Sequence, residues 1–314
     1  MKRLMYATGI LLLLLFLLCF PKEAIDAARE GMGLWLNTLI PTLLPFLILT
    51  GVLIRTGAAD GLLKPLRPVW NHVFGISSSG AYALLLGLLC GYPMGAKLSS
   101  DLYGCGRISK REAEYLLTFT SHASPVFLNT YLLQFCLEGK ISSARVYGVL
   151  LASAALTMVF FRFVVYRNRT RTPEASDRPA DTHNPKKEPF PPGSLGTMLD
   201  ASIMNGFETL TRLGGYILLF SILGACIRHY WAFGALSGNL LTGSMELTTG
   251  LHALAGSELS LSGRYLFSTV LNAFGGVCIL AQTKSLLHRE LSVLPYFLAK
   301  CLNTLFAAVL IVFF

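Results

Sequence analysis

The sequence predicts an all-α polytopic membrane protein with an N-terminal helix and two inverted repeats, each containing a re-entrant hairpin and a broken transmembrane helix. Three observations support this fold class. The 314 residues are 53% hydrophobic and 14% charged, whereas a soluble domain carries about 25% charged residues. The mean hydropathy is +0.57. Basic residues gather between apolar runs, and several runs are interrupted by Gly, Pro or polar residues.

The chain begins with the apolar stretch MKRLMYATGILLLLLFLLCF. This stretch resembles a signal peptide, which is the alternative interpretation. Signal cleavage requires small residues, but Leu18 and Phe20 flank Cys19. We therefore expect residues 1–32 to form a retained transmembrane helix. The seven cysteines contain no CxxC pair, so we expect them to be buried apolar residues and not a metal site.

Apolar runs indicate seven membrane spans, because a helix needs about 20 apolar residues to cross a bilayer. The spans are expected near residues 4–20, 34–54, 113–137, 144–166, 206–228, 264–283 and 294–314. Two shorter segments, 80–97 and 239–255, contain helix breakers and are interpreted as re-entrant. Residues 167–196 are rich in Pro, Arg and Lys, so we expect a disordered cytoplasmic linker there.

Loops rich in lysine and arginine alternate with loops that contain few of these residues, and this alternation orients the spans. The positive-inside rule places the N-terminus in the cytoplasm and the C-terminus outside. We expect a multi-pass protein of a bacterial cell membrane, with the lipid bilayer as its surroundings. The net charge of +9 lies mainly in loops, so it does not indicate nucleic-acid binding. A homo-oligomer is left open.

The spans group into two units, residues 33–166 and 197–314, that share one order of elements. Each contains a span, a re-entrant segment, an interrupted span and a further span. The first unit starts outside and the second starts inside, so the two are predicted to be inverted. Gly91 aligns with Gly243, and Ser121 aligns with Asn272. Inverted repeats with broken segments are typical of secondary transporters that bind a solute at mid-membrane.

The first re-entrant segment contains CGYPMGAK, with Gly91, Tyr92, Pro93, Gly95 and Lys97. Non-helical backbone at membrane depth is tolerated where it lines a cavity or is buried in protein. A lysine in the bilayer costs about 2.5–3.5 kcal/mol on insertion scales. We expect this hairpin tip to present its backbone and Lys97 to a solute. The alternative is that Lys97 extends to the cytoplasmic surface.

The first interrupted span contains SHASPVFLN, with candidate residues Ser121, His122, Ser124, Pro125 and Asn129. A Ser-Pro pair is typical of a helix N-cap followed by the first helical residue. A helix that restarts there directs free N–H groups into the break, which favours an anion. The alternatives are a proline kink without function and a histidine that is simply hydrogen-bonded.

The second unit offers Glu246, Thr248 and Thr249 in MELTTG, and Asn272 and Gly275 in LNAFGG. A buried carboxylate needs a partner, a proton or a cation. No cofactor is expected, and a coupling proton or sodium ion is left open. The alternatives are an exposed loop glutamate and a glycine pair that serves helix packing.

The motifs CGYPMGAK, LTFTSHASPVF and MELTTG, in this order, resemble the sporulation integral membrane protein YlbJ family, which carries nucleoside-recognition (gate) domains. The resemblance covers nearly the whole chain outside the 167–196 linker. It extends distantly to concentrative nucleoside transporters, whose two hairpins and two broken helices enclose the substrate. It implies a role in endospore formation, dipicolinate as solute and the outer forespore membrane as location.

We therefore expect a secondary transporter of a small organic anion, with dipicolinate as the first candidate. A nucleoside or another small solute is an alternative, as is a non-transporting scaffold required for sporulation. An enzyme is not expected, because no GxSxG, HExxH or P-loop pattern stands at a usable place.

Overall fold

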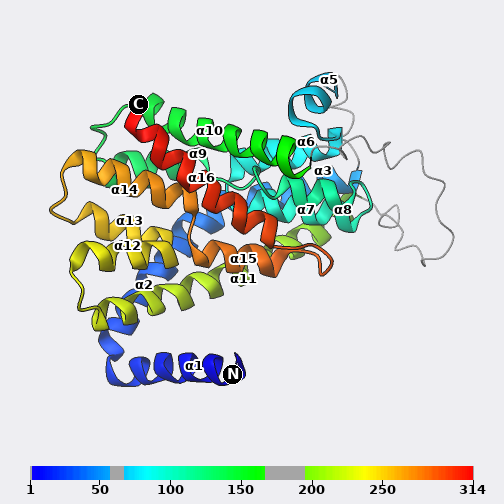
Figure 1. Cartoon of the computed structure of the whole chain (residues 1–314). Helices are drawn as coiled ribbons and strands as arrows, with labels where there is room; N and C mark the ends of the chain where they lie inside the picture. Colours follow the sequence, from blue (N-terminus) through cyan, green and yellow to red (C-terminus); the bar gives the residue numbers. More distant parts are fainter. Residues whose placement is uncertain (1, 57–66, 167–194, 314) are drawn as a thin grey trace.

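The computed structural model describes residues 2–56, 67–166 and 195–313, and these residues form helices and no strands (Figure 1). The expected all-α polytopic membrane fold is confirmed. The expected linker 167–196 lies almost entirely outside the described residues. The long helices run alongside one another in one bundle, from which α1 (Lys2–Cys19) projects (Figure 1).

The N-terminal segment differs from the single helix expected over residues 1–32. After α1 the chain turns by 106° and continues through α2 (Pro21–Leu34), a π-helical segment (Trp35–Leu39) and α3 (Ile40–Thr56). Pro21 opens α2, and a proline cannot donate the backbone hydrogen bond that would prolong α1. The side chain of Leu18 is 78% exposed, so the outer face of α1 suits lipid contact.

The first half after α3 contains a helical hairpin, a broken helix and a long helix. The elements are α5 (Arg67–Val69) with a π-helical segment (Trp70–Phe74), α6 (Ser78–Cys90), α7 (Met94–Gly104), α8 (Lys110–Leu116), α9 (Pro125–Phe127) with a π-helical segment (Leu128–Cys136), and α10 (Ser143–Phe160) with a π-helical segment (Phe161–Val165). The hairpin is α6–α7, and the break lies between α8 and α9.

The second half contains the same order of elements. They are α11 (Leu195–Tyr230), the hairpin α12 (Ala235–Met245) and α13 (Leu247–Ala255), the broken pair α14 (Leu261–Phe274) and α15 (Val277–Leu286), and α16 (Leu294–Phe313). Both hairpins and both breaks therefore occur where the sequence indicated them. Their relation as inverted repeats and the division into domains stay predictions.

Within the described residues, four helical segments are long and apolar enough to cross a membrane, or six if two bent pairs each count as one span. The four are Ser143–Val165, Leu195–Tyr230, Leu261–Leu286 and Leu294–Phe313. A multi-pass membrane protein is thus supported, although seven spans were expected. One reason for the difference is that the expected span 113–137 is divided by the non-helical residues between α8 and α9.

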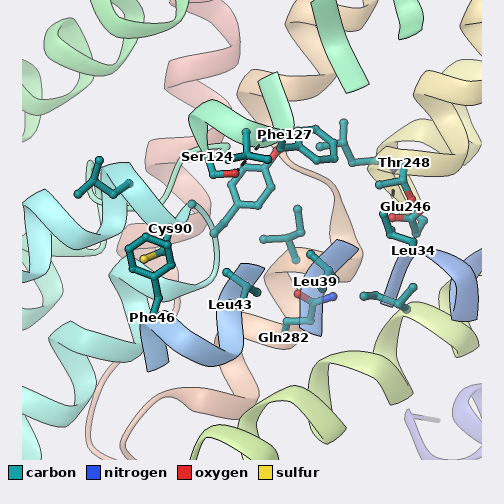
Figure 2. Close-up of a pocket in the computed structure, with 17 residues that line it drawn as sticks. Leu34, Leu39, Leu43, Phe46, Cys90, Ser124, Phe127, Glu246, Thr248 and Gln282 are labelled. Carbon is teal, nitrogen blue, oxygen red and sulfur yellow. Dashed lines mark hydrogen bonds between the residues drawn. The ribbon is translucent and has the colours of Figure 1, made fainter. Parts of the chain in front are cut away.

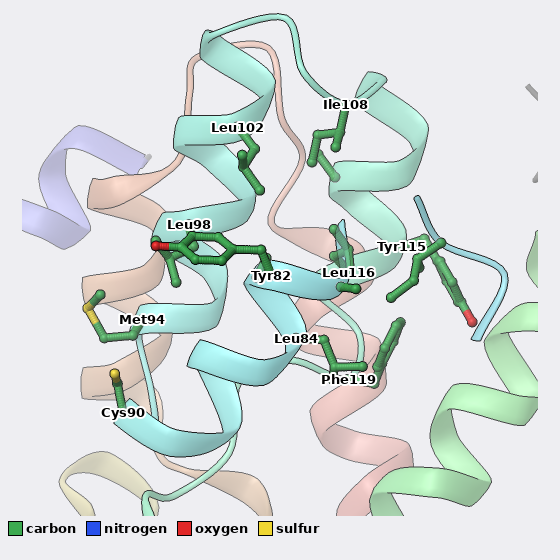
Figure 3. Close-up of a cluster of buried hydrophobic side chains, with 14 of the residues drawn as sticks. Tyr82, Leu84, Cys90, Met94, Leu98, Leu102, Ile108, Tyr115, Leu116 and Phe119 are labelled. Atoms are coloured by element: carbon green, nitrogen blue, oxygen red, sulfur yellow. The ribbon is translucent and has the colours of Figure 1, made fainter. Parts of the chain in front are cut away.

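Glycines let the two legs of each hairpin touch. A Cβ atom on Gly87 would lie 2.8 Å from the Cα of Gly95, and one on Gly250 would lie 2.0 Å from the Cα of Gly243. Gly243 therefore lies where the legs of its hairpin touch, as Gly87 does in the first hairpin, and the alignment of Gly243 with Gly91 stays a prediction. Around the first hairpin, large apolar side chains of α6, α7 and α8 fill the space between the helices (Figure 3).

Candidate functional site

The two hairpin tips and the two broken helices meet at one cavity of about 100 Å³ (Figure 2). The segment that runs from α2 into α3 closes a further side. The lining residues are Leu34, Leu39, Leu43, Phe46, Leu89, Cys90, Gly91, Tyr92, Ser124, Val126, Phe127, Ile217, Glu246, Leu247, Thr248, Ile279 and Gln282. Segments far apart in the sequence therefore share one mainly apolar enclosure with a few polar groups.

The first hairpin tip rests directly on the first break. Gly91 has φ +83°, and a Cβ there would lie 2.6 Å from the backbone nitrogen of Ser124. A Cβ on Gly95 would lie 2.2 Å from the carbonyl oxygen of Thr120. Ser124 is the N-cap of α9, and its Oγ accepts a hydrogen bond of 3.2 Å from the Phe127 N–H. This tip has no room for a larger residue at Gly91.

The second hairpin tip carries a buried carboxylate. Glu246 is 5% exposed, so the exposed-loop interpretation is wrong. Its Oε2 accepts hydrogen bonds from the Thr249 N–H and hydroxyl, both at 2.7 Å, and from the Thr248 hydroxyl at 2.5 Å. Its Oε1 accepts from the Thr248 N–H at 3.2 Å. Glu246 is thus the N-cap of α13, and the partly positive helix end stabilises its charge.

The second break contacts both hairpin tips. Gly275 and Gly276 have φ +87° and +95°, which favours glycine. A Cβ on Gly276 would lie 3.3 Å from the carbonyl oxygen of Ser244, and one on Gly275 would lie 3.7 Å from Cε1 of Tyr92. Asn272 precedes these glycines and is 3% exposed, and its Nδ2 has no hydrogen-bond partner among the described residues.

Lys97 lies outside the cavity lining, and it does not extend to the surface either. It is 6% exposed, and its Nζ lies 3.0 Å from Oδ2 of Asp101 and 3.4 Å from Oδ1 of Asn205. The acidic residue one helical turn later satisfies the ammonium. Asp101 and Asn205 also line a second depression of about 500 Å³ at the far end of the first hairpin.

The remaining candidates of the first hairpin and break do not line the cavity. Pro93 is buried and is the N-cap residue of α7. Nε2 of His122 lies 3.0 Å from the carbonyl oxygen of Phe119, as the hydrogen-bonded alternative expected. The Tyr147 hydroxyl donates to the carbonyl oxygen of Pro125 at 3.2 Å and to Oδ1 of the exposed Asn129 at 3.3 Å.

Sequence reasoning missed Lys300, a buried lysine in α16 that is 6% exposed. Its Nζ donates a hydrogen bond to the carbonyl oxygen of Ser121. The same Nζ lies over the rings of Tyr92 and Tyr296, 5.4 and 5.7 Å from their centroids. A charged residue inside the apolar run 294–314 was the available indication. Lys300 joins the last helix to the first break and the first hairpin tip.

Metal ligation has no obvious place in the described part of the chain. Within it, no group of three His, Cys, Asp or Glu side chains could hold a metal ion. The described cysteines are free thiols, some exposed and some buried.

The fold and the cavity define an all-α, multi-pass membrane protein with polar groups at its interior helix breaks. The chain is similar to the sporulation integral membrane protein YlbJ of Bacillus subtilis, with 27% identity over 339 residues that cover 98% of this chain and 81% of that protein. This near end-to-end similarity supports the resemblance to the YlbJ family that the sequence motifs indicated. No family model matches the chain, and no solved structure matches it.

Proposed function

We propose that this protein acts in sporulation as a secondary transporter of a small organic anion, with dipicolinate as the first candidate solute. One observation carries the proposal: residues of both hairpin tips and of both broken helices line one cavity. Broken helices that converge at mid-membrane are the usual solute site of secondary transporters. A purely structural membrane protein has no physical need for such paired breaks.

The walls of the cavity support a flat, partly aromatic solute. Phe46 and Phe127 present aromatic surface to it (Figure 2), and Tyr92 also belongs to the lining. Aromatic rings favour offset or edge contacts with another ring. Ser124 and Gln282 add hydrogen-bonding groups on opposite sides. The carboxylate of Glu246 repels an anion, so the carboxylates of a bound solute would face the first hairpin tip.

A neutral, hydrogen-bonding solute such as a nucleoside is the second candidate. The observation that favours it is the presence of both Glu246 and Gln282 in the lining, because these side chains can hydrogen-bond to the hydroxyl and amide groups of an uncharged solute. In this case Glu246 would contact the solute directly. A scaffold that does not transport remains the third reading.

Uptake into proteoliposomes tests the proposal. Labelled dipicolinate, nucleosides and simple dicarboxylates are offered separately, with protein-free liposomes as the baseline. Gly91→Val should abolish uptake, because its side chain would collide with the backbone of Ser124. Gly215→Ala is the matched control, since a Cβ at Gly215 meets nothing within 4 Å. Uptake of all solutes at the baseline would favour the scaffold.

A further inference from the structure

Lys300 is a buried lysine for which the described residues supply no counter-charge. Among the described residues, no carboxylate oxygen lies within 4 Å of its Nζ, in contrast to Lys97 and Asp101. A lysine ammonium has three N–H donors. Among the described residues, the carbonyl oxygen of Ser121 is the one acceptor that hydrogen-bonds to Nζ of Lys300. An uncompensated charge of this kind is costly, so it marks a functional group by default.

Polar groups around Lys300 also lack partners. Ser121 Oγ, Tyr92 OH, Asn272 Nδ2 and Asn303 Oδ1 are buried and have no hydrogen bond within the described structure. Nζ of Lys300 contacts Ser121 through the carbonyl oxygen of that residue and Tyr92 through the face of its ring. Asn303 lies one helical turn beyond Lys300, and its Nδ2 donates to the carbonyl oxygen of Ala273, next to Asn272, at 3.1 Å.

Three of these four groups, Ser121 Oγ, Tyr92 OH and Asn272 Nδ2, can donate a hydrogen bond. Ser121 and Tyr92 lie next to Lys300, and Asn272 is linked to the same helix through the bond of its neighbour Ala273 with Asn303. Each buried polar group without a partner costs about 1–3 kcal/mol. The combination of one positive charge and several free donors is the chemistry that binds a carboxylate. An apolar or cationic ligand would leave the same groups unsatisfied.

Tyr92 connects this cluster to the cavity. Tyr92 lines the cavity together with Glu246, and its ring also packs against Nζ of Lys300. Tyr92 belongs to the hairpin tip, beside Gly91 and Pro93. Rotation of the Tyr92 side chain away from Nζ would therefore expose Lys300 to a solute that is already in the cavity.

We propose that Lys300, with Ser121 Oγ and Asn272 Nδ2, forms the subsite that receives a carboxylate of the transported solute, and that Tyr92 covers this subsite in the described conformation. The inference rests on the proposed transport function and names the charged group that selects the solute. It replaces Lys97 as the cation of the site.

Binding to the purified protein in detergent tests the subsite with a charge series. The ligands are dipicolinate, its monoamide and its neutral diamide, which share one ring and differ in charge. The wild type should bind them in falling order of negative charge. Lys300→Gln should weaken dipicolinate binding about 10- to 150-fold, the range for losing a hydrogen bond to a charged group, and leave the diamide within about threefold. Lys284→Gln, at an exposed lysine on α15, is the control and should bind like the wild type.

A second variant covers the case in which Lys300→Gln does not fold. Ser121→Ala removes a hydroxyl that has no partner among the described residues and keeps the carbonyl oxygen, so the thermal unfolding temperature should not fall. Dipicolinate binding should weaken about 2- to 10-fold. Equal losses for all three ligands, or no loss, would overturn the subsite while leaving transport intact. A wild-type protein that binds none of the three would overturn the proposed function and the subsite together.

Discussion

Replacing Gly250 by alanine should separate the legs of the second hairpin and destabilise the protein. The added Cβ would lie 2.0 Å from the Cα of Gly243, whereas carbon atoms pack at about 3.5–4.0 Å. The legs must therefore part by about 1.5 Å, since the contact is with backbone that has no side chain to rotate away. Overpacking of this kind costs about 1–3 kcal/mol, and the better helix propensity of alanine offsets up to about 1 kcal/mol.

The assay is reversible unfolding in mixed micelles with increasing sodium dodecyl sulfate, followed by far-ultraviolet circular dichroism. Gly215→Ala is the matched control, because it makes the same exchange in α11 with nothing within 4 Å of the new atom. That control should be neutral or more stable by up to about 1 kcal/mol. If Gly250→Ala is as stable as the control, the close contact between the hairpin legs is refuted.

Three further perturbations test the charges and the topology. Glu246→Ala removes the acceptor of four hydrogen bonds and should destabilise the protein by about 1–2 kcal/mol in the same unfolding assay, whereas Glu246→Gln should cost less because it retains one oxygen acceptor. Asp101→Asn leaves Lys97 buried without its counter-charge and should lower the free energy of unfolding by about 1–3 kcal/mol. The double variant Asp101→Asn with Lys97→Met should lose less than the sum of the two single losses, and additive losses would disprove the pairing. A reporter in the 167–196 linker should read cytoplasmic and one after Phe314 external, and two tags on one side would remove the inverted-repeat prediction.

The sequence predicted the hairpins and breaks because their causes are local. Pro93, Pro125 and the pair Gly275–Gly276 interrupt apolar runs, and each interruption marks the end or the start of a helix in the structure. Local patterns carry such information well, since helix termination depends on neighbouring residues. The bend between α1 and α2 also has a local cause in Pro21, which the sequence reading passed over.

Tertiary contacts decide which lysine supplies the cationic group of the site, and sequence patterns do not predict those contacts. Lys97 and Lys300 are both lysines within or beside apolar runs, and only the tertiary fold brings Ser121 to Lys300, across 179 positions of chain. A closer reading could have paired Lys97 with Asp101, because residues four apart share one helix face. No pattern in the sequence could have placed Tyr92 between Lys300 and the cavity.

The glycine contacts at the two tips have a mechanical consequence. Each tip touches the break of its own half through backbone atoms, at Gly91 with Ser124 and at Gly276 with Ser244. Backbone atoms in direct contact cannot be separated by rotating a side chain. The backbones of tip and break must therefore move together as one rigid body. Collective motions of packed helices take microseconds to milliseconds, slower than the rotation of exposed side chains. The rate at which solute enters and leaves the cavity would then be limited by the displacement of whole helices. Packing contacts far from the solute would set that rate.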